Sequence, residues 1–244
     1  MRYSYSSVSA FGSCPYKWKL RYKDRLTVIP DTNPDNALYL GTAIHKGIET
    51  GNVEDAIALY KSHYHQITDK VENWIIQIEY QVPQVLAQLP PGGQHELEIK
   101  TDDFIGYADY ICGDTLYDFK FSNNIDGYRE SPQLSIYKYY LEKTHPDIKI
   151  NHLVYVFVPK LRIRQKKTET VETFRNRLRA ELKKTQITFL EVPIMENAIK
   201  DFKECCNIIK NVVEYPKNQN KLCAWCEFEK FCKSGITYDL IRRD

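Results

Sequence analysis

The sequence predicts an α/β protein whose core runs helix, three strands, helix, strand. Alternating or continuous apolar residues indicate the strands, and apolar residues three and four positions apart indicate the helices. The expected core elements are a helix at 39–51, strands at 95–100, 104–112 and 116–121, a helix at 132–143 and a strand at 153–158. Two more helices are expected at 169–184 and 193–213, with a strand at 187–191 between them.

A helical insert is expected between the first core helix and the strands, at 52–90. Asn52 is the predicted N-cap of this insert, and an interruption is expected near Pro83. The run Pro-Pro-Gly-Gly at 90–93 then ends the helical part. The insert would lie beside the cleft, where it could guide a single strand of nucleic acid.

Length and charge favour one compact enzyme over a generally basic nucleic-acid binder. The 244 residues can bury a sizeable core within a single domain. With 34 Lys and Arg against 32 Asp and Glu, the formal net charge is only +2. Binding of an anionic partner must therefore depend on local patches.

Two such patches combine cations with a regular spacing. Lysine or arginine occupies every second position from Lys160 to Lys166, which would place four cations on one side of an extended segment. This row suits either phosphate contacts or a charged edge that prevents aggregation. The segment 16–23 interleaves aromatic residues and cations, and here a helix with Trp18 and Tyr22 packed inward is favoured over a surface for single strands.

Three charged residues on two predicted strands carry the strongest functional signal. Asp118 and Lys120 are two apart, so on a strand their side chains leave the same face. A turn at Gly113-Asp114 would fold the chain back and return Asp109 to the level of Asp118. Because adjacent carboxylates repel unless a cation lies between them, the pattern predicts a divalent metal beside a lysine that stabilises charge on a phosphate.

Both core helices place polar residues where they could join this group. In the first helix Thr42 is the expected N-cap, and His45 stands beside the apolar row. In the second helix Gln133 and Tyr137 are four apart on one face. Each helix by itself is ordinary, because a lone helical histidine is more often a core or surface residue than a ligand.

In order along the chain, these motifs resemble the PD-(D/E)xK nuclease superfamily. The resemblance is to its RecB-like branch, which includes the nuclease domains of RecB and AddB and the CRISPR-associated RecB-like exonucleases. That branch has a G-x-x-x-H helix, a G-x-x-D strand, a D/E-x-K strand and a Q-x-x-x-Y helix. The matching segments are Gly41 to His45, Gly106 to Asp109, Asp118 to Lys120 and Gln133 to Tyr137.

The resemblance implies the restriction-endonuclease-like αβββαβ core and a site for Mg²⁺ or Mn²⁺. The implied metal ligands are His45, Asp109, Asp118 and the backbone carbonyl of Phe119. The implied catalytic residues are Lys120, Asp118 and Asp109, with Gln133 and Tyr137 supporting the site or touching DNA. Carboxylate ligands suit hard cations of this kind, and a histidine ligand is compatible with Mn²⁺ without excluding Mg²⁺.

The seven cysteines suggest a second metal site. Cys223, Cys226 and Cys232 form a C-x2-C-x5-C run, and Cys14 is the expected fourth ligand. Four thiolates suit either zinc or an iron–sulfur cluster. The polar start of the chain and the lack of a long apolar run predict a reducing, cytoplasmic location without disulfides or membrane spans. Three cysteines are expected to be buried, inert thiols: Cys112, Cys205 and Cys206.

One cysteine near the start and three near the end resemble the 4Fe–4S domain of AddB and related CRISPR-associated nucleases. The resemblance favours a 4Fe–4S cluster over zinc, and such a cluster would staple the two ends of the chain together. The expected organisation is a single nuclease domain, 1–244. Its parts are a catalytic core at 39–51 and 94–160, the insert at 52–90 and a cluster region at 14 and 215–233.

The expected activity is that of a metal-dependent deoxyribonuclease, an exonuclease acting on single-stranded DNA ends in recombination, repair or CRISPR-related processing. A catalytically silent DNA-binding or decoy protein of the same fold is the alternative, and a zinc-finger-like binding module is a third. A decoy has no chemical need to keep His45, Asp109, Asp118, Lys120 and Gln133 together. Because the chain has no helicase motif, any unwinding would come from a helicase or recombination partner. The oligomeric state is open.

Overall fold

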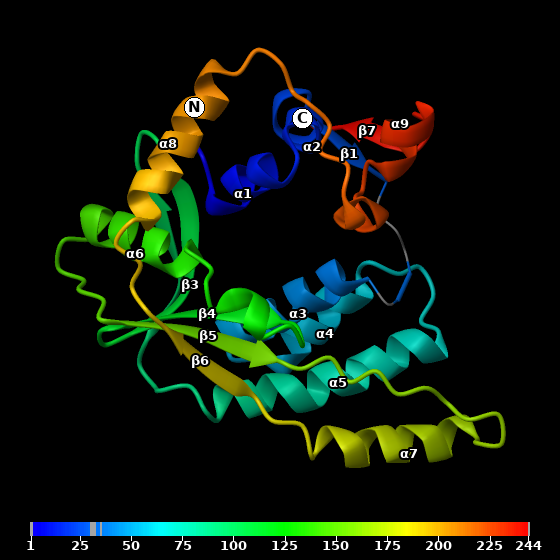
Figure 1. Ribbon diagram of the computed structural model, residues 1–244. Coiled ribbons are helices and arrows are strands. Elements are labelled where there is room, and N and C mark those ends of the chain that lie inside the picture. The colour runs from blue at the N-terminus through cyan, green and yellow to red at the C-terminus, as the bar shows by residue number, and fades with distance from the viewer. Residues whose placement is uncertain (1, 30–32, 35, 244) are drawn as a thin grey trace.

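A five-stranded mixed sheet forms the centre of the computed structural model, which describes residues 2–29, 33–34 and 36–243 (Figure 1). The strand order is β2-β3-β4-β5-β6. β2, β3 and β4 form an antiparallel meander, β5 is parallel to β4, and β6 is antiparallel to β5. The strands are β2 (Gln94–Lys100), β3 (Ile105–Cys112), β4 (Thr115–Phe121), β5 (His152–Val158) and β6 (Thr188–Val192).

The helices that flank the strands complete the expected αβββαβ order. α3 (Ala37–Thr50) precedes β2, and α6 (Gln133–Thr144) connects β4 with β5. A parallel strand pair needs such a crossover connection. The predicted α/β fold is therefore confirmed, with β6 added as a fifth strand at the edge. Two later helices also form where expected, α7 (Val171–Leu182) and α8 (Ala198–Asn211).

Helices cover both faces of the sheet. α1 (Tyr5–Ser13), α6 and α8 pack on one face, and α3, α4 (Val53–Lys61) and α5 (Asp69–Leu86) pack on the other. β5 is buried on both faces and alternates between the two cores. Its run of seven residues, six of them buried and apolar, is the pattern expected of a central strand in a parallel pair.

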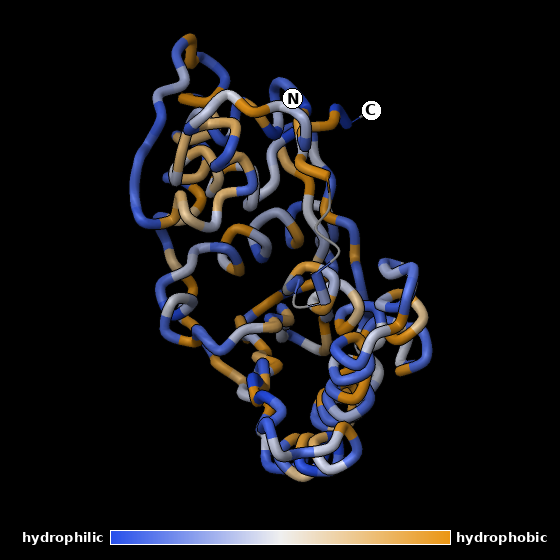
Figure 2. Tube along the Cα trace, turned by 90° about the vertical axis from the view of Figure 1, so that its right-hand side faces the viewer, coloured by the Kyte–Doolittle hydropathy of each residue, from blue (hydrophilic) through white to orange (hydrophobic). Residues whose placement is uncertain are grey.

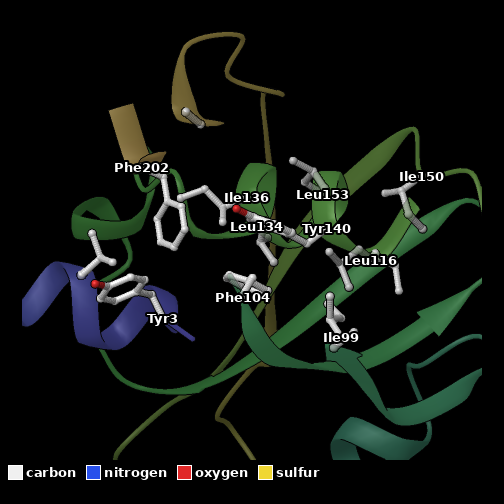
Figure 3. Packing of buried hydrophobic residues seen from close by; sticks show 14 of the residues in the cluster. Tyr3, Ile99, Phe104, Leu116, Leu134, Ile136, Tyr140, Ile150, Leu153 and Phe202 are labelled. Atoms are coloured by element: carbon white, nitrogen blue, oxygen red, sulfur yellow. The ribbon is translucent and has the colours of Figure 1, made fainter. Parts of the chain in front are cut away.

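Aromatic side chains are prominent in the first core, which lies between the sheet and α1, α6 and α8. Phe104 stacks on Tyr140 with ring centroids 4.1 Å apart and meets Phe202 at 5.7 Å (Figure 3). Tyr3 forms a parallel bridge with Phe104, so the beginning of the chain is fastened beside β3. Burial of each such ring stabilises the fold by about 1.5–3 kcal/mol.

The first core helix begins earlier than the sequence suggested. Asn36 caps α3, because its side chain accepts a hydrogen bond from the Leu38 N–H at 3.0 Å. Thr42 lies inside the helix, where its hydroxyl donates to the Leu38 carbonyl at 2.9 Å. The assignment of Thr42 as N-cap is therefore wrong. The helix extends upstream because Leu40 is buried in the second core, which lies between the sheet and α3, α4 and α5.

The insert contains two helices rather than one interrupted helix. Asn52 caps α4 as predicted, with its side chain accepting a backbone N–H at 3.0 Å. A new cap at Thr68 starts α5, so the break falls at 62–68. Pro83 lies within α5 and does not interrupt it. Pro83 is exposed on the helix surface, and α5 continues past it to Leu86 without the one intrahelical hydrogen bond that proline cannot donate.

An N-terminal and a C-terminal segment pair at the top of Figure 1. β1 (Leu26–Val28) pairs antiparallel with β7 (Leu240–Arg242). Trp18 is buried there and stacks on Tyr22 and Tyr215, which fits the inward-packed helix expected for 16–23. The remaining short elements are α2 (Pro15–Trp18), the π-helical turn η1 (Lys19–Lys23), the 3-10 turns η2 (Asp126–Tyr128) and η3 (Lys221–Trp225), and α9 (Glu229–Ser234).

Hydropathy follows this layered arrangement. Figure 2 shows hydrophilic residues, in blue, along the peripheral loops and hydrophobic residues, in orange, alternating with them in the helices. Such alternation is typical of helices that bury one face. Among the described helices, none is long and apolar enough to cross a membrane.

Candidate metal and active site

Three carboxylates form one row across β2, β3 and β4. The β2–β3 register is regular on both sides of Glu96, which places Glu96 opposite Asp109. The pairing of Tyr110 with Tyr117 beside the turn likewise places Asp109 level with Asp118. Residues opposite each other on antiparallel strands share a face. The predicted return of Asp109 to the level of Asp118 is thus what the strand register produces.

The backbone ladder opens at this row. Within the described strands, Asp109 has no ladder partner on β2 or β4. The backbone N–H and carbonyl of Phe119 on β4 contact side chains instead. Its N–H donates to Asp109 Oδ2 at 2.8 Å, and its carbonyl oxygen lies 2.9 Å from His45 Nε2. The opening therefore brings the histidine of α3 and the carboxylate of β3 to the backbone of the same residue, Phe119.

Asp118 is held from two sides. The Gln133 side-chain amide on α6 donates to Asp118 Oδ1 at 2.8 Å, and Lys120 Nζ lies 2.6 Å from Oδ2. The buried Oδ2 is ion-paired with this ammonium, and the described residues give it no further partner. Buried polar atoms are nearly always satisfied. Asp118 Oδ2 is therefore suited to receive a cation.

Lys120 lies between the carboxylates and an aromatic wall. Its ammonium is 5.6 Å from the ring centre of Tyr128 and 5.7 Å from that of Tyr155. Burial by itself lowers the pKa of Lys120, but the Asp118 carboxylate outweighs burial and leaves the pKa above its ordinary value. Lys120 is thus a fixed positive charge, and the rings limit where it can point.

Burial also sets the protonation of the other two groups. Burial, followed by the charge of Asp118, raises the pKa of Asp109 well above its ordinary value. Burial lowers the pKa of His45, so its ring is neutral and has a lone pair to share. His45 Nδ1 lies 3.7 Å from Asp109 Oδ2. A shared cation would relieve the repulsion that raises the pKa of Asp109.

A divalent metal fits this arrangement. His45, Glu96 and Asp109 offer ligand atoms that all lie within 4.8 Å of one another. An octahedral Mg²⁺ with bonds of about 2.1 Å places its ligands about 3 to 4.2 Å apart. The 2.9 Å between His45 Nε2 and the Phe119 oxygen also fits two neighbouring ligands. Asp118 lies in the same row, and its part in metal binding stays a prediction.

Glu96 is the candidate ligand that sequence reasoning missed. Charged and apolar residues alternate along β2, and this pattern predicts that Glu96 faces solvent. Its φ is 49°, in the left-handed region that costs a residue other than glycine about 1–2 kcal/mol. Burial, followed by the charge of Glu49, raises its pKa. A strained acidic residue facing two other acids is a functional signal that needs coordinates.

Tyr137 supports the site from α6. It lies one turn after Gln133 on α6, and burial raises the pKa of its hydroxyl, so the hydroxyl stays protonated. Gly106, the glycine of the G-x-x-D motif, makes room for this ring. A Cβ at that position would lie 3.0 Å from the Phe104 ring and 3.4 Å from the Tyr137 ring. The glycine is therefore explained by packing under the site.

The four predicted cluster cysteines line one cavity of about 600 Å³ between the two ends of the chain. Backbone bonds join these ends: Tyr16 N–H donates to the Pro216 carbonyl at 3.2 Å. The Asn218 N–H points at Cys14 Sγ at 3.5 Å, and the Asn220 N–H points at Cys223 Sγ at 3.5 Å. The cavity residues include Cys14, Cys223, Cys226 and Cys232.

The spacing of these thiols differs from that of a closed zinc site. Tetrahedral zinc with Zn–S bonds of 2.3 Å would hold four sulfurs about 3.8 Å apart. Among the described residues, the group of metal-ligand atoms within 4.8 Å of one another contains no cysteine. The other three cysteines are partly buried rather than fully buried, and burial raises the pKa of Cys205 and Cys206. A raised pKa keeps those two thiols protonated, and the inertness expected of all three cysteines stays a prediction.

Comparison with known proteins identifies the family. The family model of the PD-(D/E)XK nuclease superfamily matches residues 2–233, nearly the whole chain. The chain therefore belongs to the PD-(D/E)XK nuclease superfamily. No curated protein matches the chain. Membership supports a metal-dependent nuclease that acts on DNA, and it agrees with the row of carboxylates beside Lys120.

Proposed function

We propose that the protein is a metal-dependent DNA exonuclease of the RecB-like branch that acts on single-stranded ends. One observation carries this proposal: the ladder opening aligns Glu96, Asp109 and Asp118 and points Lys120 at the same place. A structural salt bridge would need one acid for one lysine. Three acids and a neutral histidine are the ligand set of a hard divalent cation.

The metal ligands in this proposal are His45, Asp109, Asp118 and the Phe119 carbonyl, joined by Glu96. Mg²⁺ or Mn²⁺ bound there would activate water and offset charge on the phosphate. The chain's own residues fix the geometry. Gln133 holds Asp118 Oδ1, and the Phe119 N–H holds Asp109 Oδ2, so both carboxylates keep their orientation.

Lys120 is the proposed catalytic residue. Its positive charge adds to that of the metal and stabilises the extra negative charge that develops as the phosphodiester bond breaks. Its proton is retained because the neighbouring carboxylates keep its pKa high. Gln133 positions the acids rather than reacts, because its amide holds Asp118 Oδ1, and Tyr137, one turn further along α6, supports the site.

A 4Fe–4S cluster on Cys14, Cys223, Cys226 and Cys232 is the proposed second cofactor. Support comes from the common cavity, the N–H donors aimed at two of the sulfurs and a thiol spacing wider than zinc requires. The cluster would staple the ends of a single nuclease domain that spans 1–244. A helicase or recombination partner would supply unwound DNA.

Digestion of blocked and circular substrates tests the exonuclease assignment. The substrates are a labelled linear single strand, the same strand blocked at either end, and a circular single strand, each with Mn²⁺ and anaerobically purified protein. The proposal predicts that a block at one end stops digestion and that the circle survives. Equal cleavage of the circle would make the protein an endonuclease. Cleavage of none of them would favour the catalytically silent, DNA-binding alternative.

A further inference from the structure

A second cavity, of about 580 Å³, lies between α5 and the segment 159–165 that follows β5. We call this cavity the basic groove. Phe121 on β4 and Leu40 on α3 line it, so the groove lies on the α3 and α5 side of the sheet, and the side chain of Phe121 points to the opposite face from that of Lys120. Its lining includes four cations and one aromatic residue: Lys70 and Trp74 from α5, and Lys160, Arg162 and Arg164 from the segment 159–165.

Side-chain amides fix the backbone of the segment 159–165. Buried Gln77 on α5 donates to the Leu161 carbonyl at 3.0 Å and accepts the Leu161 N–H at 3.2 Å. Asn123 does the same for Lys160, at 3.0 Å and 2.7 Å. The segment belongs to no strand, and these pairs satisfy the backbone groups of Lys160 and Leu161 in place of a ladder. Its side chains therefore have defined directions.

An ion pair holds the far end of this segment. Arg177 on α7 donates to the Arg164 carbonyl at 2.9 Å and forms a two-pronged pair with Glu169 at 2.8 Å. Glu169 also accepts the Lys166 N–H at 3.0 Å. Bidentate arginine–carboxylate pairs are geometrically specific. The basic segment is consequently pinned at both ends.

The fixed backbone sorts the side chains by alternation. Leu161 and Ile163 pack against the small core between α5 and α7. Arg162 and Arg164 are exposed and line the groove, as the spacing of cations in the sequence suggested. Among the described lining residues the carboxylate is Asp69, and Arg175 neutralises it at 2.9 Å. The groove is therefore positively charged.

An aromatic ring lies opposite these cations. Trp74 is partly exposed, and its ring meets that of Phe121 edge-on, with centroids 6.4 Å apart. Lys160 Nζ lies 5.0 Å from the centre of the Phe121 ring. Cations that follow a backbone and a ring that stacks on bases are the two parts of a single-strand binding site. A duplex keeps its base faces stacked inside and offers them to no side chain.

We propose that the basic groove, on the α5 side of the sheet that carries the candidate active site, binds single-stranded DNA. Phosphates lie against Lys160, Arg162 and Arg164, and a base stacks on Trp74. This inference rests on the proposed nuclease function and adds a second surface that holds the strand. It also gives the helical insert a role, because α5 forms one wall of the groove.

Anisotropy of a labelled oligothymidine tests the phosphate contacts. All proteins carry Asp118→Asn, and the buffer contains EDTA, so that binding is measured without cleavage. The double variant Arg162→Ala/Arg164→Ala should bind about tenfold more weakly, and its slope of log K against log salt should fall by about 1.4. The matched control Lys200→Ala/Lys210→Ala removes the same charge from exposed positions of α8 and should change affinity less than twofold. Equal effects of both doubles would overturn the groove.

Two substitutions of Trp74 test the stacking contact. Trp74→Phe keeps an aromatic face and should bind within about threefold of the parent, whereas Trp74→Leu keeps the apolar packing and should lose about tenfold. Thermal denaturation checks that both fold. Equal affinities for the two variants would contradict stacking. A blunt duplex should be little affected, and a loss as large as that of the single strand would contradict the single-strand assignment.

These binding tests separate the groove from the nuclease proposal. A wild-type protein that cleaves single strands, with groove variants that bind normally, would overturn the groove alone. Groove-dependent binding by a protein that cleaves no DNA would support the groove and overturn the nuclease.

Discussion

The Gln133 side-chain amide donates to Asp118 Oδ1 at 2.8 Å and so joins the start of α6 to the middle of β4. This bond turns the other carboxylate oxygen, Oδ2, toward Lys120. One helix residue thus sets the direction of the buried acid on which the site depends. Orientation of a ligand by a second residue is a recurring feature of metal sites.

Loss of this bond should weaken the enzyme without unfolding it. Gln133→Leu preserves the volume but removes the donor, so Asp118 gains rotational freedom. We expect turnover to fall about 10- to 100-fold. Steady-state kinetics with Mn²⁺ measures the change, and circular dichroism checks the fold. Unchanged kinetics would show that Asp118 needs no orienting partner.

Lys120 and Asp118 should separate turnover from metal binding. Lys120→Ala should retain Mn²⁺ but lose about 10²- to 10³-fold in turnover, because one stabilising charge is removed. Asp118→Ala should lose both. Calorimetric titration of Mn²⁺ and single-turnover cleavage measure the two properties. Lys143→Ala, which changes an exposed lysine on α6, is the control. Normal cleavage by Lys120→Ala would remove the catalytic role given to that lysine.

Glu96 should trade metal affinity against stability. Glu96→Gly and Glu96→Ala both delete the carboxylate and should weaken Mn²⁺ binding. Glycine alone relieves the left-handed backbone, so Glu96→Gly should be about 1 kcal/mol more stable to urea than Glu96→Ala. Equal stability of the two variants would show that the φ of 49° is not strained. Normal Mn²⁺ affinity in both would exclude Glu96 as a ligand.

Glu169 should make the basic segment sensitive to acid. The Arg177 hydrogen bonds, followed by the Lys166 N–H, lower the pKa of Glu169 from 4.5 to about 2. A lowered pKa stabilises the fold at pH values above 4.5, and this contribution disappears as the pH falls toward 2. Glu169→Gln should therefore lower the melting temperature at pH 7 and make little difference near pH 2. The same difference at both pH values would contradict the ion pair.

The cluster proposal predicts iron that depends on four named thiols. Anaerobically purified wild type should be brown and contain about four iron atoms per chain. Cys232→Ser should lose the colour and most of the iron. Cys112→Ser, outside the cavity, is the control and should keep both. Zinc in place of iron would make the site a structural zinc centre.

Local patterns predicted the fold well because they act over short distances. The apolar run of β5 and the Gly113 turn fix the strands, and the turn alone brings Asp109 level with Asp118. The prediction of Thr42 as N-cap was wrong because α3 extends upstream, where Leu40 is buried against residues far away in the sequence. Capping preferences do not contain that information.

The part of the site that the sequence could not predict depends on backbone geometry. Glu96 itself has a left-handed backbone conformation within β2, and the alternation of side chains along a strand does not predict it. The Phe119 N–H and carbonyl become available only because the ladder opens beside them. The clamps of Gln77 and Asn123 on the segment 159–165 likewise join residues far apart in the chain.

The carboxylate row across β2, β3 and β4 is proposed to be a nuclease active site. The most direct test is cleavage of end-labelled single-stranded DNA with and without Mn²⁺ by anaerobically purified wild type and Asp118→Ala. We predict cleavage by the wild type that requires Mn²⁺ and disappears in Asp118→Ala. Equal cleavage by the two proteins, or none by folded wild type that binds Mn²⁺, would contradict the claim.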